Sequence, residues 1–176
     1  CRVVIMGEDG AILPSGAQGE ICVRGDQVMR GYYKNPVATA ATLIDGWLHT
    51  GDIGFLDAQG YLHIVDRKKD MIISGGFNVY PAEVERVVAN HPAVQDCAVI
   101  GAPHADWGEQ VTAVIELKAG HSATADEIMA FCRERLSGVK TPKAVQFTAE
   151  LPRSPVGKVL RRKVREPFWA GRERRI

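Results

Sequence analysis

The sequence predicts an α+β fold, in which a β-rich segment is followed by a smaller domain of alternating helices and strands. Before Asp66, short apolar runs of strand character alternate with Gly-containing turns, and only one short helix is indicated. After this point, helical and extended hydrophobic periods alternate. The charged stretch RKKD separates the two parts. We therefore expect a boundary near residues 66–70 and, beyond it, a short sheet flanked by helices.

The first part contains signals for two hairpins, a separate strand and a capped helix. One hairpin is predicted by RVVIM and AIL around the turn GEDG, and the other by residues 53–66 around a turn at 57–60. The segment GEICVRG predicts a short strand. The segment NPVATAATLI favours a short helix, with Asn35 as its N-cap and Pro36 at its first position.

The second part alternates between helix and strand. A helix is expected to begin at Pro81 in PAEVERVVANHP, because its valines share one helical face. The segments VQDCAVIGAP and VTAVIELK predict strands. Thr124 and Glu127 form a capping-box pattern at the start of TADEIMAFCRERL, which therefore predicts a second helix. A strand at AVQF and a final helix at GKVLRRKVREPF complete the pattern.

The composition is ordinary for a soluble globular protein. Of the 176 residues, 45% are hydrophobic and 24% charged, and the formal net charge is +1, which favours neither nucleic acid nor a membrane as partner. Residues 153–175 are rich in Lys and Arg, a stretch that could meet a polyanion, but we interpret most of these residues as a solvated basic tail. No apolar run is long enough to predict a transmembrane segment. The chain opens within an apparent strand, so we expect it to be a piece of a longer protein.

The cysteine pattern predicts reduced thiols in a cytoplasmic protein. No C-x-x-C pair and no Cys/His spacing typical of zinc is present, so we expect no metal ligand in this chain. Isolated cysteines of this kind are most often buried and reduced. The four are Cys1, Cys22, Cys97 and Cys132.

Three segments carry more glycine and charge than their neighbours. The first, WLHTGD, ends in Asp52 on an expected turn, where an aspartate commonly stabilises the bend. In the second, DRKKDMIISGGFNVYPAEVE, Gly75 and Gly76 allow a close backbone approach or positive φ, as a plain strand-to-helix turn also requires. In the third, LPRSPVGKVLRR, Lys158 lies on an exposed loop, where it can reach a phosphate or simply be solvated.

Taken in order, these segments resemble the adenylate-forming superfamily, which comprises acyl-CoA synthetases, adenylation domains of peptide synthetases and luciferase. The resemblance extends from about residue 19 to residue 162, and GAPHADWGEQVTAVI and LPRSPVGKVLRR make it most similar to fatty-acyl or aryl CoA ligases. It implies that residues 1–66 are the β-rich, barrel-like end of a large AMP-binding domain. Residues 67–176 would then form the mobile C-terminal lid.

The resemblance also implies a reaction and a role for individual residues. The family activates a carboxylic acid with Mg-ATP to an acyl-adenylate and pyrophosphate, and a thiol, usually that of CoA, then displaces AMP. By this resemblance, Asp52 binds the ribose hydroxyls and Arg67 contacts the nucleotide. Lys69 matches the hinge position about which the lid rotates. Lys158 matches the lysine that bridges the acyl carboxylate and the phosphate during adenylation.

After the rotation, another set of residues is expected to reach the site. Gly75 and Gly76 match glycines that line the tunnel for the pantetheine arm of CoA, where a side chain would block the passage. Trp107 matches a tryptophan near the same arm, and Lys143 matches a basic residue near the phosphates of CoA.

Other parts of the family pattern are absent from this sequence. We find no Ser/Thr/Gly-rich phosphate loop ending in Lys and no Tyr-Gly-x-Thr-Glu segment, which supplies the adenine contact and a Mg²⁺ ligand. We therefore expect the Mg²⁺ ligands and the acyl pocket on an N-terminal domain of the same enzyme, and no ligase activity from this chain alone. Two alternatives remain: an adenylation domain that loads a carrier protein, and a non-catalytic nucleotide- or CoA-binding module.

Overall fold

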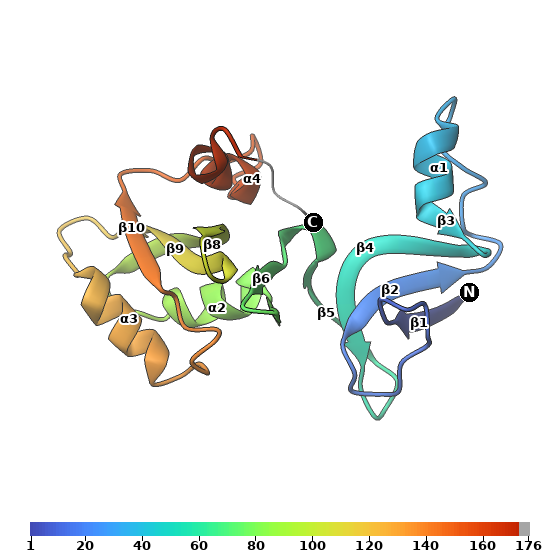
Figure 1. Ribbon diagram of the computed structural model, residues 1–176, viewed down its shortest axis with the longest axis horizontal. Coiled ribbons are helices and arrows are strands. Elements are labelled where there is room, and N and C mark those ends of the chain that lie inside the picture. The colour runs from blue at the N-terminus through green and yellow to red at the C-terminus, as the bar shows by residue number, and fades with distance from the viewer. Residues whose placement is uncertain (173–176) are drawn as a thin grey trace. The chain divides into compact units, whose positions relative to one another are not determined.

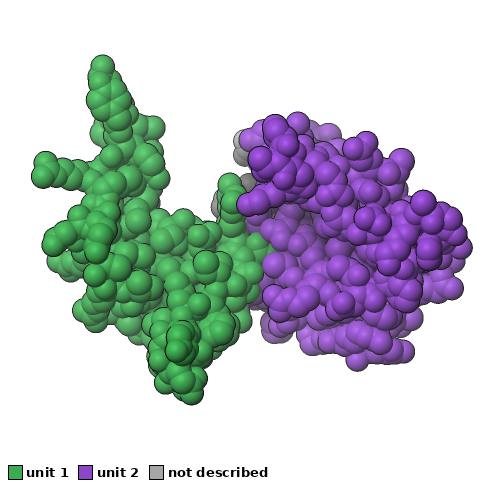
Figure 2. All heavy atoms as spheres, turned by 180° about the vertical axis from the view of Figure 1, so that it is seen from behind, with its two compact units in different colours: residues 1–69 green, residues 70–176 purple. Residues whose placement is uncertain are grey.

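The computed structural model describes residues 1–172 and has the expected α+β fold (Figure 1). The chain divides into two compact units, residues 1–69 and residues 70–176, which Figure 2 shows in different colours. We call them unit 1 and unit 2. Residues 67–69, which the sequence assigned to the second domain, thus belong to unit 1. The end of the basic tail, Arg174 and Arg175, lies outside the described residues.

Unit 1 is a five-stranded antiparallel sheet with one short helix. The strands follow the order β1-β2-β4-β3, and β5 pairs with the far end of the long, curved β4 (Figure 1). Its small core contains Val4, Met6 and Cys22, against which Trp47 packs. The strands are β1 (Arg2–Met6), β2 (Gly19–Arg24), β3 (Leu43–Ile44), β4 (Trp47–Leu56) and β5 (Leu62–Arg67).

The local signals of unit 1 are mostly confirmed. Helix α1 (Pro36–Thr42) has the predicted N-cap, since the Asn35 side chain accepts a hydrogen bond from the Ala38 amide. The second hairpin is present as β4 and β5. The first hairpin is shorter than predicted: Ile12 forms only an isolated bridge with Met6, while β1 pairs along its whole length with β2.

Unit 2 contains a five-stranded mixed sheet in which β8 and β9 form a long antiparallel pair. Strand β10 lies parallel to β9 on its other side, and a short hairpin of β6 and β7 completes the sheet. The strands are β6 (Ile72–Ser74), β7 (Phe77–Val79), β8 (Val94–His104), β9 (Gly108–Leu117) and β10 (Ala144–Thr148). The helices are α2 (Pro81–Val88), α3 (Ala125–Arg133) and α4 (Arg161–Arg165), followed by the 3-10 turn η2 (Glu166–Trp169). Another 3-10 turn, η1 (Lys68–Asp70), spans the division between the two units.

Both faces of the β8–β9 pair are covered, which explains why these strands are almost continuously apolar. On one face, Val99 packs in a cluster with residues of α2 and α3, including Val84 and Ile128. On the other face, Ala98 and Ile100 pack with Leu151 and with Val164 of α4. The predicted capping box of α3, between Thr124 and Glu127, is present.

The final helix is shorter than predicted. The sequence pattern placed its start near Gly157, but α4 begins at Arg161 and ends at Arg165. The preceding residues form a tight turn instead, because Gly157 has a φ of +81° and Val159 bridges back to Arg153. Consequently Lys158 lies outside the helix.

All four cysteines are free thiols, and three of them are buried, as the sequence predicted. Burial raises the pKa of Cys22 to about 11 and that of Cys97 to about 12, so both remain protonated near neutral pH. Among residues 1–172, no helix has the length and apolar character needed to cross a bilayer.

Candidate functional site

Asp52 lies in a bulge of strand β4, and the turn expected at this position is wrong. On β2, Cys22 pairs with His49 and Glu20 pairs with Ile53, so β4 carries extra residues between these two pairs. Gly51, within the bulge, has a φ of +75°, a conformation that favours glycine. Bulges re-aim side chains, and this one is stabilised by a hydrogen bond from the Asp52 amide to Thr50 Oγ1 (3.1 Å).

A buried carboxylate supports the bulge from the neighbouring strand. Glu20 accepts hydrogen bonds from the Gly51 amide (3.1 Å), His49 Nδ1 (3.1 Å) and Lys68 Nζ (2.9 Å). Burial raises the pKa of Glu20, but the hydrogen bonds from His49 and Lys68, the charge of Lys68 and the Gly51 amide together outweigh it and lower the pKa. Glu20 is therefore ionised at neutral pH, and it connects the bulge to the end of β5.

The same carboxylate belongs to a group with metal-ligand chemistry. Ligand atoms of Glu20, Cys22 and His49 lie within 4.8 Å of one another. However, the ammonium group of Lys68 already contacts Glu20, and the Cys22 thiol is protonated at neutral pH. We interpret the group as a hydrogen-bonded ion network that stabilises β2 and β4.

Arg67 is the residue directly opposite Asp52 in the antiparallel pair of β5 and β4. Directly opposite residues of an antiparallel pair project from the same face of the sheet. Within the described residues, neither the Asp52 carboxylate nor the Arg67 guanidinium has a hydrogen-bond or ion-pair partner. The two candidate nucleotide contacts are thus neighbours on one face, each with free bonding capacity.

Lys69 lies in the 3-10 turn η1, which connects β5 to β6. The division between the two compact units falls between Lys69 and Asp70. The candidate hinge residue is therefore the last residue of unit 1.

Gly75 and Gly76 form the two-residue turn of the β6–β7 hairpin. Their φ values are +58° and +82°, and Ser74 pairs with Phe77 across them. Two positive φ values are what a type I′ turn requires, so glycine is favoured here by backbone conformation alone. The alternative of a plain strand-to-helix turn is wrong, because β7 lies between the glycine pair and α2.

A cavity of about 440 Å³ lies beside this turn in unit 2. Its lining includes Gly75, Trp107 and Lys143, so three of the four candidate CoA contacts meet at one place. The Gly75 amide donates a hydrogen bond to the Trp107 carbonyl (3.0 Å), and the indole stacks on His104 with the ring centres 4.3 Å apart. Lys143 Nζ donates a hydrogen bond to the Gly138 carbonyl. The cavity thus has aromatic walls and one cationic group.

Lys158 lies on a short hairpin, residues 152–160, that we call the lysine hairpin. The Gly157 amide donates to the Ser154 carbonyl (2.9 Å), and the Leu160 amide donates to the Pro152 carbonyl (2.8 Å). The Lys158 backbone is fixed by its amide, which donates to Ser154 Oγ (3.1 Å). Its ammonium group, by contrast, is exposed and has no partner among the described residues.

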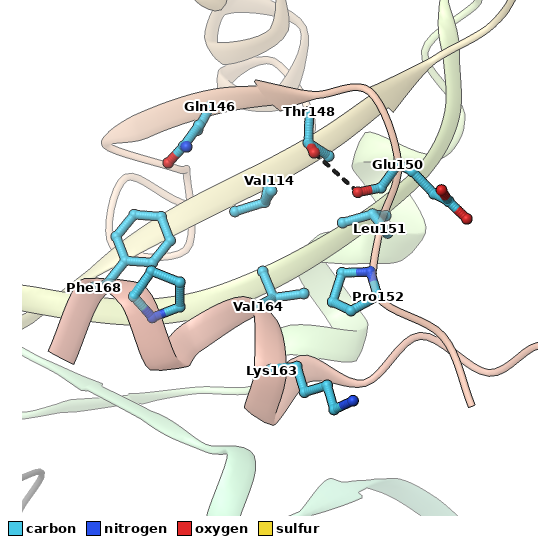
Figure 3. Close-up of a pocket in the computed structure, with 10 residues that line it drawn as sticks. Val114, Gln146, Thr148, Glu150, Leu151, Pro152, Lys163, Val164 and Phe168 are labelled. Carbon is cyan, nitrogen blue, oxygen red and sulfur yellow. Dashed lines mark hydrogen bonds between the residues drawn. The ribbon is translucent and has the colours of Figure 1, made fainter. Parts of the chain in front are cut away.

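A second cavity in unit 2, of about 320 Å³, contains none of the predicted site residues (Figure 3). Its apolar floor includes Val114, Leu151 and Val164, and a hydrogen bond joins Thr148 to the Glu150 carbonyl at its edge. The Lys163 ammonium points away from this floor (Figure 3).

Several charged residues that hold the site elements in place were not predicted from the sequence. Glu20 and Lys68 support the bulge at Asp52, whereas Arg153 and Arg161 lie at the two ends of the lysine hairpin. Glu20 falls within a strand pattern, and the two arginines fall in a stretch that we interpreted as a solvated basic tail. That interpretation is wrong for Arg153 and Arg161, because both form ion pairs in unit 2.

Comparison with known proteins agrees with this arrangement. Residues 83–158 match the family model of the AMP-binding enzyme C-terminal domain. A long-chain-fatty-acid–CoA ligase of Escherichia coli O6:H1 is 49% identical over 162 residues, covering 92% of this chain and 29% of the ligase. A feruloyl-CoA synthase of an Amycolatopsis species is 49% identical over 166 residues, covering 94% of this chain and 34% of the synthase.

Solved structures show the same fold. ATP-bound MatB from Rhodopseudomonas palustris superimposes with a TM-score of 0.88 and 41% identity, covering 94% of this chain and 33% of MatB. The amide bond synthetase McbA from Marinactinospora thermotolerans gives a TM-score of 0.85 and 40% identity, covering 95% of this chain and 34% of McbA.

These similarities define the class of protein. Residues 83–158 are an AMP-binding enzyme C-terminal domain, and the chain belongs to the adenylate-forming enzymes as their C-terminal part. It spans about a third of the length of the curated relatives that it matches.

Proposed function

We propose that this chain is the C-terminal part of an ATP-dependent acyl-CoA synthetase. The complete enzyme would convert a carboxylic acid, ATP and CoA into acyl-CoA, AMP and pyrophosphate through an acyl-adenylate. Similarity to a long-chain-fatty-acid–CoA ligase supports a fatty acid as substrate, while equal identity to a feruloyl-CoA synthase keeps aromatic acids as the competing class. The free thiols agree with a cytoplasmic location.

The observation that carries this proposal is a contrast between paired and unpaired charges. In the described part of the chain, Asp52, Arg67 and Lys158 each keep a charged side chain without a partner. Nearby charged residues such as Glu20, Arg153 and Arg161 are all paired. A polar substrate needs side chains that are not already paired within the protein. The unpaired groups at these three motif positions can therefore form hydrogen bonds with such a substrate.

Each of these groups has a role suited to its chemistry. The Asp52 carboxylate accepts two hydrogen bonds from the vicinal hydroxyls of the ribose. Arg67, on the same face, contacts the nucleotide with a planar guanidinium that matches phosphate oxygens. The Lys158 ammonium stabilises the negative charge that develops at the α-phosphate as the acyl carboxylate attacks and pyrophosphate leaves. Mg²⁺, held by residues that we expect outside this chain, would neutralise phosphate charge.

The cavity at Gly75, Trp107 and Lys143 suits the second half-reaction. The thin pantetheine arm of CoA can pass beside a turn that lacks side chains, against the aromatic surface of Trp107. Lys143 would contact the phosphates of CoA as a point charge. Lys69 would act as the hinge, since a few residues between compact units can absorb the change in φ and ψ.

The partner of this chain would be the large AMP-binding domain of the same enzyme, without which we expect no activity. Similarity to the amide bond synthetase McbA supports an amine as an alternative acceptor to CoA, and a carrier-protein thiol is the third candidate acceptor. A non-catalytic nucleotide- or CoA-binding module is disfavoured, because such a module needs no unpaired Lys158.

The experiment uses the longer enzyme that contains this chain. ATP–pyrophosphate exchange is measured with fatty and aromatic acids, and acyl transfer is then measured with CoA, an amine and a carrier protein. We expect exchange with a fatty acid and transfer to CoA. Exchange only with aromatic acids would revise the substrate, transfer only to an amine would revise the acceptor, and no exchange with any acid would contradict the proposal.

A further inference from the structure

Arg161 connects the lysine hairpin to two other parts of unit 2. It is the first residue of α4, and only Val159 and Leu160 separate it from Lys158 in the sequence. Its Nε donates to Glu85 Oε1 (2.7 Å) and its Nη2 to Glu85 Oε2 (2.5 Å), so Arg161 forms a bidentate ion pair with helix α2. Its Nη1 lies 3.6 Å from Oδ2 of Asp70, and Asp70 directly follows the candidate hinge residue Lys69 in the sequence.

Glu85 extends this connection into the sheet. Its Oε1 also accepts a hydrogen bond from the Val99 amide of β8 (2.9 Å). The side chains of Arg161, Glu85 and Asp70 are only 23%, 19% and 13% exposed. Because shielding from water strengthens such contacts and the Arg161 fork is geometrically specific, the network fixes where the chain leaves the lysine hairpin.

A second arginine holds the other end of the hairpin. Arg153 pairs with Asp96 (2.8 Å) and Glu116 (3.3 Å), which belong to β8 and β9, and donates a hydrogen bond to the Gly157 carbonyl (3.3 Å). Leu151, which precedes the hairpin, is almost fully buried in the apolar cluster with Val164. The hairpin is thus anchored at both ends, while the exposed Lys158 ammonium group has no partner among the described residues.

We propose that Arg161 is a positioning residue for Lys158. Arg161 couples the lysine hairpin to Asp70, the residue after the candidate hinge, and through Glu85 to the core of unit 2. The idea rests on the proposed function of Lys158 in adenylation. With Arg161 in place, the hairpin moves with unit 2 as one body, and Lys158 arrives in a defined position. Without it, the ammonium group samples many positions, and misplacement of a catalytic group by about 1 Å can reduce a rate about a hundredfold.

The neighbouring Arg162 offers a matched control. It belongs to the same helix and has the same charge, but its side chain is 80% exposed, and its one ion pair within residues 1–172 is with Glu166, one turn along. Such exposed pairs contribute little to stability. The variants are therefore Arg161→Met, Arg161→Lys and Glu85→Gln, compared with Arg162→Met.

The first measurement separates the two half-reactions in the longer enzyme. We expect Arg161→Met to lower kcat for ATP–pyrophosphate exchange at least tenfold with little change in KM for ATP. Thioester formation from supplied acyl-adenylate should stay within twofold of the unmodified enzyme. The decrease in kcat for exchange should be smaller in Arg161→Lys, and Arg162→Met should have the kcat of the unmodified enzyme. A parallel loss in both half-reactions, or equal behaviour of Arg161→Met and Arg162→Met, would refute the positioning role.

The second measurement is hydrogen exchange in the 176-residue chain itself. The Lys158 and Leu160 amides donate within the hairpin, so we expect their exchange to become at least tenfold faster in Arg161→Met but not in Arg162→Met. Where Arg161→Met does not fold, Arg161→Lys and Glu85→Gln give the same comparison. If the unmodified enzyme makes no acyl-adenylate, the proposed function fails, and faster exchange in the hairpin still decides whether Arg161 anchors it. Unchanged exchange would contradict the anchoring.

Discussion

Asp52 and Arg67 lie directly opposite each other on strands β4 and β5. In an antiparallel pair, such residues have Cβ atoms about 4.5–5.5 Å apart on one face of the sheet. An acidic and a basic side chain therefore meet at one place, although neither pairs with the other in the described part of the chain. A ligand that carries both hydroxyl groups and phosphates can contact the two together, as a nucleotide does.

Removing the charge at Asp52 should weaken nucleotide binding specifically. In the longer enzyme, Asp52→Asn is expected to raise KM for ATP about 10- to 100-fold, since hydrogen bonds to charged groups contribute about 1.5–3 kcal/mol. The exposed Asp26→Asn serves as control and should behave as the unmodified enzyme. Steady-state kinetics with varied ATP checks this, and an unchanged KM in Asp52→Asn would remove Asp52 from the nucleotide site.

The role of Gly75 can be tested without disturbing its turn. Asparagine is favoured at the first position of a type I′ turn, so Gly75→Asn should preserve the hairpin. A Cβ at Gly75 would meet only Trp107 Cδ1, at 3.9 Å, so the new side chain fits beside the cavity. We expect thioester formation from acyl-adenylate to fall at least tenfold while ATP–pyrophosphate exchange is retained.

The control for this substitution is Gly120→Asn. Gly120 also has a positive φ, +74°, and nothing lies near its added Cβ. Both variants should keep the melting temperature of the unmodified enzyme within a few degrees. If Gly75→Asn transfers acyl groups to CoA as fast as Gly120→Asn, the glycine pair serves the turn alone.

Lys143 should contribute to CoA affinity rather than to the chemical step. Lys143→Ala removes one cation from the cavity, so KM for CoA is expected to rise about tenfold, in line with the loss of one charge-assisted contact. Lys163→Ala, beside the other cavity, should leave this KM unchanged. Equal effects of the two substitutions would mean that Lys143 acts only through net charge.

Glu20 should make the stability of the chain dependent on acidic pH. Its folded-state pKa is lowered below the usual 4.5, so its contribution is present above that pH and lost as the pH falls through the lower, folded-state value. Glu20→Gln is expected to lose roughly 1–3 kcal/mol of unfolding free energy at pH 7. Urea unfolding between pH 7 and pH 3 checks this: the difference between the two proteins should shrink below pH 4.5. A constant difference across this range would show that the carboxylate charge is unimportant.

Local signals in the sequence predicted local structure well. The capping residues Asn35 and Thr124 mark the starts of α1 and α3, since an N-cap depends on groups within a few residues. The nearly continuous apolar runs of β8 and β9 were equally readable as strands. The β6–β7 hairpin was missed because Gly75 and Gly76 are flanked by strands of only three residues each, too short for a periodic signal.

The supporting charges could not be predicted, because they act between segments that are distant in sequence. Glu20 contacts Lys68, and Arg161 contacts Glu85, across many intervening residues. Within a basic stretch, the local sequence does not distinguish a Lys or Arg that forms an ion pair in the fold from one that is solvated. Likewise, the meeting of Gly75, Trp107 and Lys143 depends on how three loops pack, which periodicity does not encode.

The most direct test of the central claim is the effect of Lys158→Ala on the two half-reactions of the longer enzyme. If Lys158 stabilises the charge that builds on the phosphate, ATP–pyrophosphate exchange should fall about a hundredfold or more. Thioester formation from supplied acyl-adenylate and CoA should remain within a few-fold of the unmodified enzyme. Unchanged exchange, or an equal loss in both half-reactions, would contradict the assignment of Lys158 and, with it, the proposed function of the lysine hairpin.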